Sequence, residues 1–228
     1  MSSTGNEGGA PPRAVIFDVD QTLLYTLKRF YKVFNATLNK FGLDPVSWEK
    51  FLELYSRDSL STVFEGRVDR DDFWKIFLED YDIECREDRP IEGAEEALRR
   101  AKELGLRVIV ATGRRTPVES LRREMERFGL AKYVDSFYTA REDPWVRGYA
   151  KVGMMRRILE REKLRPEEVI MVADYLPDME LARRMGMRAI AVLTGLMPEE
   201  ELRRRGAQWV IDSIAQLPPL LERILKDP

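Results

Sequence analysis

Short hydrophobic runs alternate with longer amphipathic stretches along most of this chain. The runs are rich in β-branched residues and apolar on both faces, as expected of strands buried in a parallel sheet. They cover residues 14–17, 107–111, 169–173, 188–193 and 208–211, with a weaker candidate at 136–139. The hydrophobic pattern therefore predicts a sheet assembled from segments far apart in the sequence.

Amphipathic segments between these runs carry helix boundary signals. The segment 92–104 is followed by Gly105, a typical residue after a helix end. The segment 116–128 opens on a Thr cap with Pro117 at its first position and Glu119 at its third. Further helical stretches are expected at residues 151–163, 166–168 and 177–185. Alternating strands and helices predict an α/β fold with a doubly wound parallel sheet.

Residues 25–89 interrupt this alternation. They contain no convincing buried strand, and their apolar residues, many of them aromatic, recur at helical spacing. We interpret the segment as an inserted helical domain whose aromatic residues pack mainly against one another. The predicted core domain then comprises residues 13–24 and 90–228, and residues 1–12 form a disordered tail rich in Gly, Ser and Pro.

Composition narrows the functional classes. Among 228 residues, 38 Lys and Arg face 40 Asp and Glu, so the net charge is −2. This balance gives no electrostatic reason to expect nucleic acid or an anionic membrane as a partner. The abundance of both signs is typical of ion-pair networks in heat-adapted proteins. No apolar run is long enough to span a membrane and no hydrophobic signal region is visible, so we expect a cytoplasmic protein.

Two residue counts exclude whole mechanisms. The chain has no His, which excludes Ser-His-Asp and Cys-His catalysis and His-ligated zinc. Its one cysteine, Cys85, cannot form an internal disulfide or a Cys-rich metal site. A metal site built from oxygen ligands remains possible.

Acidic residues follow the predicted strands at their carboxyl ends, where ligands bind in parallel sheets. Asp18 and Asp20 follow the first strand, Thr112 ends the second, and Asp174 and Asp178 follow the fourth. Carboxylates repel one another unless a cation lies among them. An oxygen-only ligand set suits Mg²⁺, which commonly adds waters and phosphate oxygens.

These motifs, in this order, resemble the haloacid dehalogenase superfamily. The helical insertion after the first motif is similar to the cap of its phosphoglycolate-phosphatase-like branch. The matching positions are Asp18-x-Asp20-x-Thr22, Thr112, Lys151 and Asp174-x-x-x-Asp178. Gln21 stands where the family commonly has Gly, and Lys151 is followed by Val152 rather than Pro, which leaves Arg147 as an alternative to Lys151.

The resemblance implies a phosphatase that works through an aspartyl-phosphate. Asp18 would attack phosphorus, one of the known reactions of carboxylate nucleophiles. Asp20 would protonate the leaving oxygen and then activate water. The resemblance also implies a small phosphorylated metabolite as substrate.

The same resemblance assigns the remaining site residues. Mg²⁺ would be held by Asp18, the main-chain carbonyl of Asp20, Asp174 and Asp178. The transferred phosphate would be bound by Thr112, the Gly113 amide and Lys151 at a helix start.

Several alternatives stay open. A dehalogenase or a sugar phosphomutase could use the same fold, although a dehalogenase has no use for Asp20. A non-catalytic binding protein is the alternative from another class. Arg114 and Arg115 are expected to be solvated, and Tyr25 and Tyr55 are two of the candidates for substrate contact from the insertion, with Arg57 and Arg67. The protein could be a monomer or a homodimer.

Overall fold

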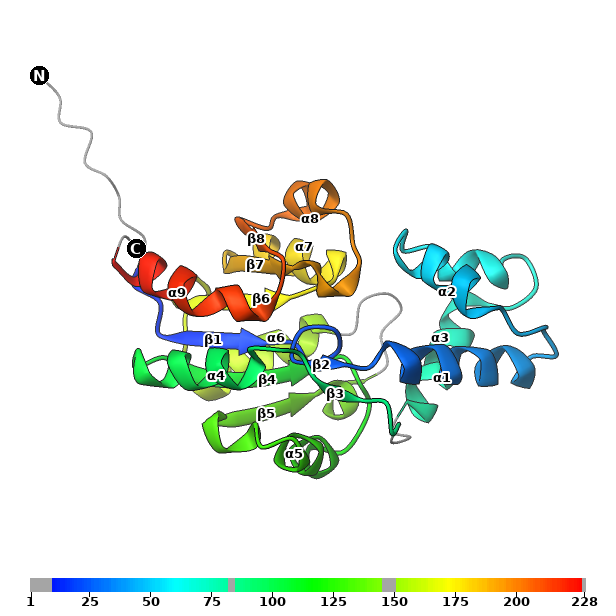
Figure 1. Cartoon of the computed structure of the whole chain (residues 1–228), viewed down its shortest axis with the longest axis horizontal. Helices are drawn as coiled ribbons and strands as arrows, with labels where there is room; N and C mark the ends of the chain where they lie inside the picture. Colours follow the sequence, from blue (N-terminus) through cyan, green and yellow to red (C-terminus); the bar gives the residue numbers. More distant parts are fainter. Residues whose placement is uncertain (1–9, 82–84, 145–150, 227–228) are drawn as a thin grey trace, which may run out of the picture.

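A parallel sheet of six strands, in the order β5-β4-β1-β6-β7-β8, forms the centre of the molecule (Figure 1). The computed structural model describes residues 10–81, 85–144 and 151–226. The strands are β1 (Ala14–Phe17), β4 (Arg107–Thr112), β5 (Ser136–Thr139), β6 (Val169–Ala173), β7 (Arg188–Val192) and β8 (Trp209–Ile211). Every neighbouring pair is parallel, which confirms the predicted fold class.

The register of the central strands brings the predicted motifs to one edge. Phe17, the last residue of β1, pairs with Val110 in β4 on one side and Val172 in β6 on the other. The residues that follow these strands therefore lie at the same level. Since the chain order runs in opposite directions on the two sides of β1, this edge is also the switch point where α/β proteins bind ligands.

Helices cover both faces of the sheet. The helices α4 (Ala94–Glu103), α5 (Val118–Arg127) and α9 (Leu217–Lys226) pack on one face, and α6 (Lys151–Glu162), α7 (Leu176–Met185) and α8 (Glu199–Arg205) pack on the other. Alternate side chains of a strand point to opposite faces. Accordingly, Val15 and Phe17 join the first hydrophobic cluster, whereas Ala14 and Ile16 join the second.

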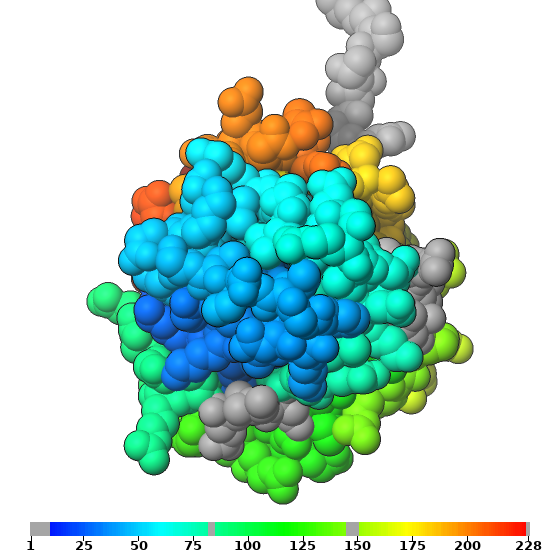
Figure 2. All heavy atoms as spheres, turned by 90° about the vertical axis from the view of Figure 1, so that its right-hand side faces the viewer, coloured from blue at the N-terminus to red at the C-terminus, as the bar shows by residue number. Residues whose placement is uncertain are grey.

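The inserted segment forms a helical cap beyond the carboxyl ends of the strands (Figure 1). Its helices are α1 (Leu27–Lys40), α2 (Trp48–Tyr55) and α3 (Arg70–Asp80). The Phe30 ring lies within 6.2 Å of five other aromatic rings, from Phe51, Tyr55, Trp74, Phe77 and Tyr81. This packing gives the cap a hydrophobic cluster of its own. Figure 2, viewed from the cap side, shows the cap spread over this end of the core.

The junctions between the core and the cap contain one feature that was not predicted from the pattern. The strands β2 (Leu24–Tyr25) and β3 (Arg89–Pro90) pair antiparallel where the chain enters and leaves the cap. Each has two residues, too few to show a period. A second difference from the prediction concerns the start of helix α5. The helix begins at Val118, and Pro117 is its N-cap residue, because the backbone of Pro117 is extended with ψ 143°. The helix N-cap predicted at Thr116 is therefore wrong.

Short 3₁₀ turns complete the described elements. They are η1 (Leu60–Val63), η2 (Ala131–Tyr133), η3 (Ala140–Glu142), η4 (Pro166–Glu168), η5 (Leu193–Gly195) and η6 (Ile214–Gln216). In the part of the chain that is described, no helix has the length and apolar character needed to cross a membrane.

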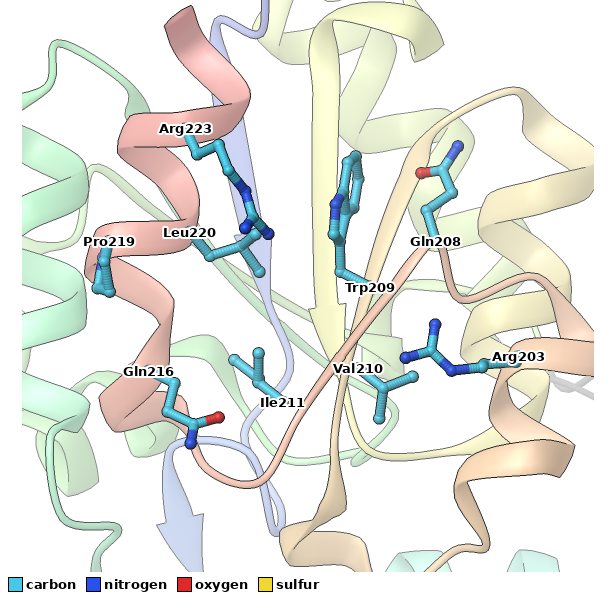
Figure 3. Close-up of a pocket in the computed structure, with 9 residues that line it drawn as sticks. All are labelled: Arg203, Gln208, Trp209, Val210, Ile211, Gln216, Pro219, Leu220 and Arg223. Atoms are coloured by element: carbon cyan, nitrogen blue, oxygen red, sulfur yellow. The ribbon is translucent and has the colours of Figure 1, made fainter. Parts of the chain in front are cut away.

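A groove lies at the edge strand β8, with Arg203 of α8 and Arg223 of α9 on its two sides (Figure 3). Its other lining residues are Gln208, Trp209, Val210, Ile211, Gln216, Pro219 and Leu220. None of the candidate site residues lines it.

Candidate functional site

Asp18 and Lys151 form a buried ion pair at the carboxyl edge of the sheet. Asp18 follows β1 directly, and Lys151 is the first residue of α6. The Lys151 ammonium lies 2.7 Å from Oδ1 of Asp18 and 2.9 and 3.0 Å from the two carboxylate oxygens of Asp178. The structure thus brings together residues from three of the four motifs.

The fourth motif completes a cluster of buried carboxylates. Asp174 follows β6, and its Oδ1 accepts a hydrogen bond of 3.4 Å from the Thr22 hydroxyl. Asp178 lies in the first turn of α7 with no exposed surface. Burial raises the pKa of Asp174 well above its usual range, and the charges of Asp18 and Asp178 add to this effect. Burial also raises the pKa of Asp18 to about 7, although Lys151 opposes the rise.

The chemistry of this cluster fits a hard divalent cation. The Lys151 ammonium pairs with two of the three buried acidic groups, Asp18 and Asp178, so the cluster contains more acidic groups than basic ones. Among the described residues, no three acidic or thiol side chains already converge into a metal-binding group, and the Lys151 ammonium contacts both Asp18 and Asp178. Carboxylates with excess negative charge are nevertheless the ligands that Mg²⁺ prefers.

The predicted phosphate-binding residues line the same edge. Thr112 ends β4, is 1% exposed, and accepts a 3.2 Å hydrogen bond from the main-chain N–H of Arg114. A Cβ atom on Gly113 would lie 3.4 Å from Cε of Lys151, so this glycine adjoins the lysine side chain. The arrangement is suited to binding a phosphate next to Asp18.

Asp20 has different partners from Asp18. Arg114 donates from Nε to Oδ2 at 2.8 Å and from Nη2 to Oδ1 at 2.7 Å. The hydroxyls of Thr26 and Tyr81 also donate to Oδ1. Burial alone would raise the pKa of Asp20, but the Arg114 guanidinium outweighs burial and holds the pKa well below its usual range. Asp20 is therefore a carboxylate in this structure.

The expectation that Arg114 is solvated is wrong. Arg114 is 3% exposed and forms ion pairs with Asp20 and Glu124. Sequence reasoning missed Glu124 altogether, because a carboxylate on α5 cannot be assigned to an arginine of the preceding loop without the fold. Arg115 is half-buried, and its Nη1 donates to the main-chain oxygen of Ala140 at 3.0 Å.

Two tyrosines are among the cap residues that reach this edge. Tyr55 packs in both the cap cluster and one core cluster, and burial, with the charges of Asp174 and Asp20 adding, raises its pKa well above the usual range. Tyr81 contacts Asp20 directly.

The other candidates for substrate contact have partners within the cap or its junctions. Arg89 lies over the Tyr25 ring, Arg57 pairs with Glu53, and Arg67 donates to the main-chain oxygen of Val63. Arg147, the alternative to Lys151, lies outside the described residues.

The motifs at this edge agree with comparisons to known proteins. The chain is 28% identical over 223 residues to the N-acetylmuramic acid 6-phosphate phosphatase of Pseudomonas aeruginosa, covering 94% of this chain and 97% of that protein. It is 26% identical over 218 residues to the pyrophosphatase PpaX of Bacillus cereus, covering 92% of this chain and 96% of that protein.

Solved structures share the fold. The crystal structure of a predicted phosphatase from Clostridium acetobutylicum superposes with a TM-score of 0.74 at 21% identity, covering 95% of this chain and all of that chain. The model of the haloacid dehalogenase-like hydrolase family matches residues 15–192. The chain therefore belongs to the haloacid dehalogenase-like hydrolase family, with a helical cap inserted after the first motif.

Proposed function

We propose that this protein is a Mg²⁺-dependent phosphatase that hydrolyses a small phosphomonoester through an aspartyl-phosphate on Asp18. The observation that carries the proposal is the buried Asp18 carboxylate, held by Lys151 beside Asp178. The phosphatase and pyrophosphatase names of its relatives support the same class of reaction.

The nucleophile is the Asp18 carboxylate. Lys151 binds Oδ1, so we assign Oδ2 as the atom that attacks phosphorus. A bond forms between Oδ2 and phosphorus while the bond to the leaving oxygen breaks. Lys151, the Thr112 hydroxyl and the Gly113 amide hold the phosphate oxygens and balance the charge that develops on them.

Asp20 moves the protons. Asp20, ionised in the free protein, takes up one proton as the anionic phosphate binds beside it and gives that proton to the leaving oxygen. It then takes a proton from the water that hydrolyses the aspartyl-phosphate. This restores Asp18 and releases inorganic phosphate. Such acid–base assistance is worth roughly 10²–10⁴-fold in rate.

The carboxylates of Asp18, Asp174 and Asp178 and the main-chain carbonyl of Asp20 would hold Mg²⁺. The bound ion would reduce the repulsion between the anionic nucleophile and the anionic phosphate.

We assign residues 13–24 and 90–228 to the core domain and residues 25–89 to the cap domain. The cap covers this end of the core (Figure 2). Its Tyr81 donates a hydrogen bond to Asp20. A cap in this position favours a small substrate and excludes bulk water from the aspartyl-phosphate.

The test is hydrolysis of p-nitrophenyl phosphate with Mg²⁺ and with EDTA. We expect turnover in Mg²⁺, loss of turnover in EDTA, and loss in Asp18→Asn. Asp44→Asn, an identical change in an exposed loop between α1 and α2, should leave the rate unchanged. Phosphate release by Asp18→Asn at the wild-type rate would contradict the proposal, and chloride release from a haloacid without metal would favour a dehalogenase.

A phosphoanhydride such as inorganic pyrophosphate is a second candidate substrate. Arg114 keeps Asp20 charged, which suits a leaving group that needs little protonation. The pyrophosphatase name of the Bacillus cereus relative points the same way. A kcat/KM for pyrophosphate above that for alkyl phosphates would favour this candidate.

A further inference from the structure

Five charged side chains form a continuous buried series beside the site. Asp20 pairs with Arg114, Arg114 with Glu124, Glu124 with Arg29, and Arg29 with Asp88. Four of them are less than 9% exposed, and the side chain of Asp20 is 24% exposed. Arg29 belongs to the cap helix α1, whereas Glu124 belongs to the core helix α5. The series therefore crosses from the core to the cap.

Stability alone does not account for these buried charges. Removing charges from water is costly, and apolar residues of similar volume often stabilise a fold equally well or better. Unlike apolar packing, ion pairs fix the orientation of the side chains that form them. Arg114 contacts both oxygens of Asp20 through two nitrogens, the planar arrangement that fixes a carboxylate in one orientation.

The hydrogen bonds distinguish the two oxygens of Asp20. Within the described residues, Oδ1 accepts from Arg114, Thr26 and Tyr81, whereas Oδ2 accepts from Arg114 alone. An ionised carboxylate oxygen has about two acceptor sites. Oδ1 is therefore saturated, and Oδ2 keeps a lone pair that can carry a proton to a leaving oxygen or accept one from a water.

We propose that Arg114 is a positioning residue for the reaction, which orients Asp20 so that Oδ2 takes and gives the proton. This inference rests on the proposed phosphatase function. Arg114 acts through Asp20 and is itself held by Glu124, whose other oxygen binds Arg29 of the cap. The cap thus supports the orientation of Asp20 from a distance.

A double-mutant cycle in turnover tests this role. The variants are Arg114→Met, Asp20→Asn and the double variant, assayed with p-nitrophenyl phosphate and Mg²⁺. We expect Arg114→Met to lower kcat by about 100-fold, the effect of a misplaced catalytic group. In the Asp20→Asn background the same change should lower kcat no further, because the carboxylate that Arg114 orients is already absent.

Further measurements separate positioning from phosphate binding and from folding. The inhibition constant for inorganic phosphate should be the same in Arg114→Met and wild type. Arg114→Lys, which keeps the charge but loses the two-nitrogen contact, should also lower kcat while melting near the wild-type temperature. Arg100→Met, which breaks the Arg100–Glu222 pair between α4 and α9, is the matched control and should retain full activity.

Two results would overturn the inference while leaving the phosphatase intact. One is that Arg114→Met lowers kcat by the same factor in the wild-type and Asp20→Asn backgrounds. The other is that inorganic phosphate inhibits Arg114→Met more weakly than it inhibits the wild type. A folded wild type without turnover would instead refute the proposed function, and this inference with it.

Discussion

Gly195 and Asp174 pack so closely that no side chain fits between them. A Cβ atom on Gly195 would lie 2.5 Å from Cβ and 2.6 Å from Cγ of Asp174. Gly195 follows β7 and Asp174 follows β6, so two neighbouring strands end in direct contact. Because the Cβ of Asp174 is fixed by the backbone, a larger residue at 195 would displace the segment after β6 that carries Asp174.

We therefore expect Gly195→Ala to lower kcat/KM by about 100-fold, as small displacements of catalytic groups do. Its control is Gly129→Ala, in the turn between α5 and η2 and outside the candidate site. Gly129 has φ +72° and open space around it, so this change introduces backbone strain of about 1 kcal/mol without a steric clash. The test is to measure kcat/KM and the melting temperature of both variants. A Gly195→Ala enzyme with wild-type kcat/KM would show that Asp174 tolerates displacement.

The central sheet could be predicted because each buried strand is apolar on both faces. Three runs, 14–17, 136–139 and 169–173, match the observed strands residue for residue. The ribbon of β2 and β3 could not be predicted, since its pairing depends on where the cap returns to the core.

The motif residues could be predicted to meet because strands of a parallel sheet end at one edge. Lys151 does contact Asp18 and Asp178, as the motif order implies. The burial of Arg114 could not be predicted, because its partner Glu124 is a charged residue on the buried face of α5, beside Leu121 and Met125, and the pattern does not show which cation it meets there. Gly195 carried a weak signal, since a glycine just beyond a strand often marks a close approach.

Gln21 adopts a backbone conformation that favours glycine. Its φ is +55°, and with its amide oxygen toward α1 it accepts hydrogen bonds from the main-chain N–H groups of Thr26 (3.2 Å) and Leu27 (3.0 Å). Gln21→Ala and Gln21→Gly both lose these bonds, but only alanine keeps the strain. We expect Gln21→Gly to be more stable than Gln21→Ala by about 1 kcal/mol in denaturant unfolding. Equal stabilities would mean that the backbone here is not strained.

The raised pKa of Asp18 predicts a pH-dependent stability in EDTA. Burial raises this pKa from 3.8 to about 7, against the opposing charge of Lys151. Between these values the folded protein holds a proton that the unfolded chain has released. Asp18 therefore lowers the free energy of unfolding as the pH rises from about 4 to about 7, with no further loss above.

The measurement is the difference in unfolding free energy between wild type and Asp18→Asn, followed across this pH range in EDTA. We expect the difference to move in favour of the variant as the pH rises and then to level off. A difference that does not change with pH would mean that Asp18 titrates normally in the folded protein.

A hydrogen bond between Tyr175 and Asp58 joins the segment after β6, which carries Asp174, to the cap. The Tyr175 hydroxyl donates to Oδ1 of Asp58 at 2.8 Å, and Asp58 follows α2 with φ +51°. Such a bond contributes about 1 kcal/mol. Losing it reduces the fraction of molecules with the cap in place, and apparent substrate affinity falls with that fraction.

We expect Tyr175→Phe to raise KM by up to about fivefold, the equivalent of this bond, with kcat maintained. Asp58→Gly should do the same, because glycine accepts the positive φ, and the double variant should be no worse than either. Asp58→Asn keeps both the acceptor oxygen and the backbone preference and should retain the wild-type KM. Additive increases in KM from Tyr175→Phe and Asp58→Gly would show that the two residues act separately, and that the cap is held in place by other contacts.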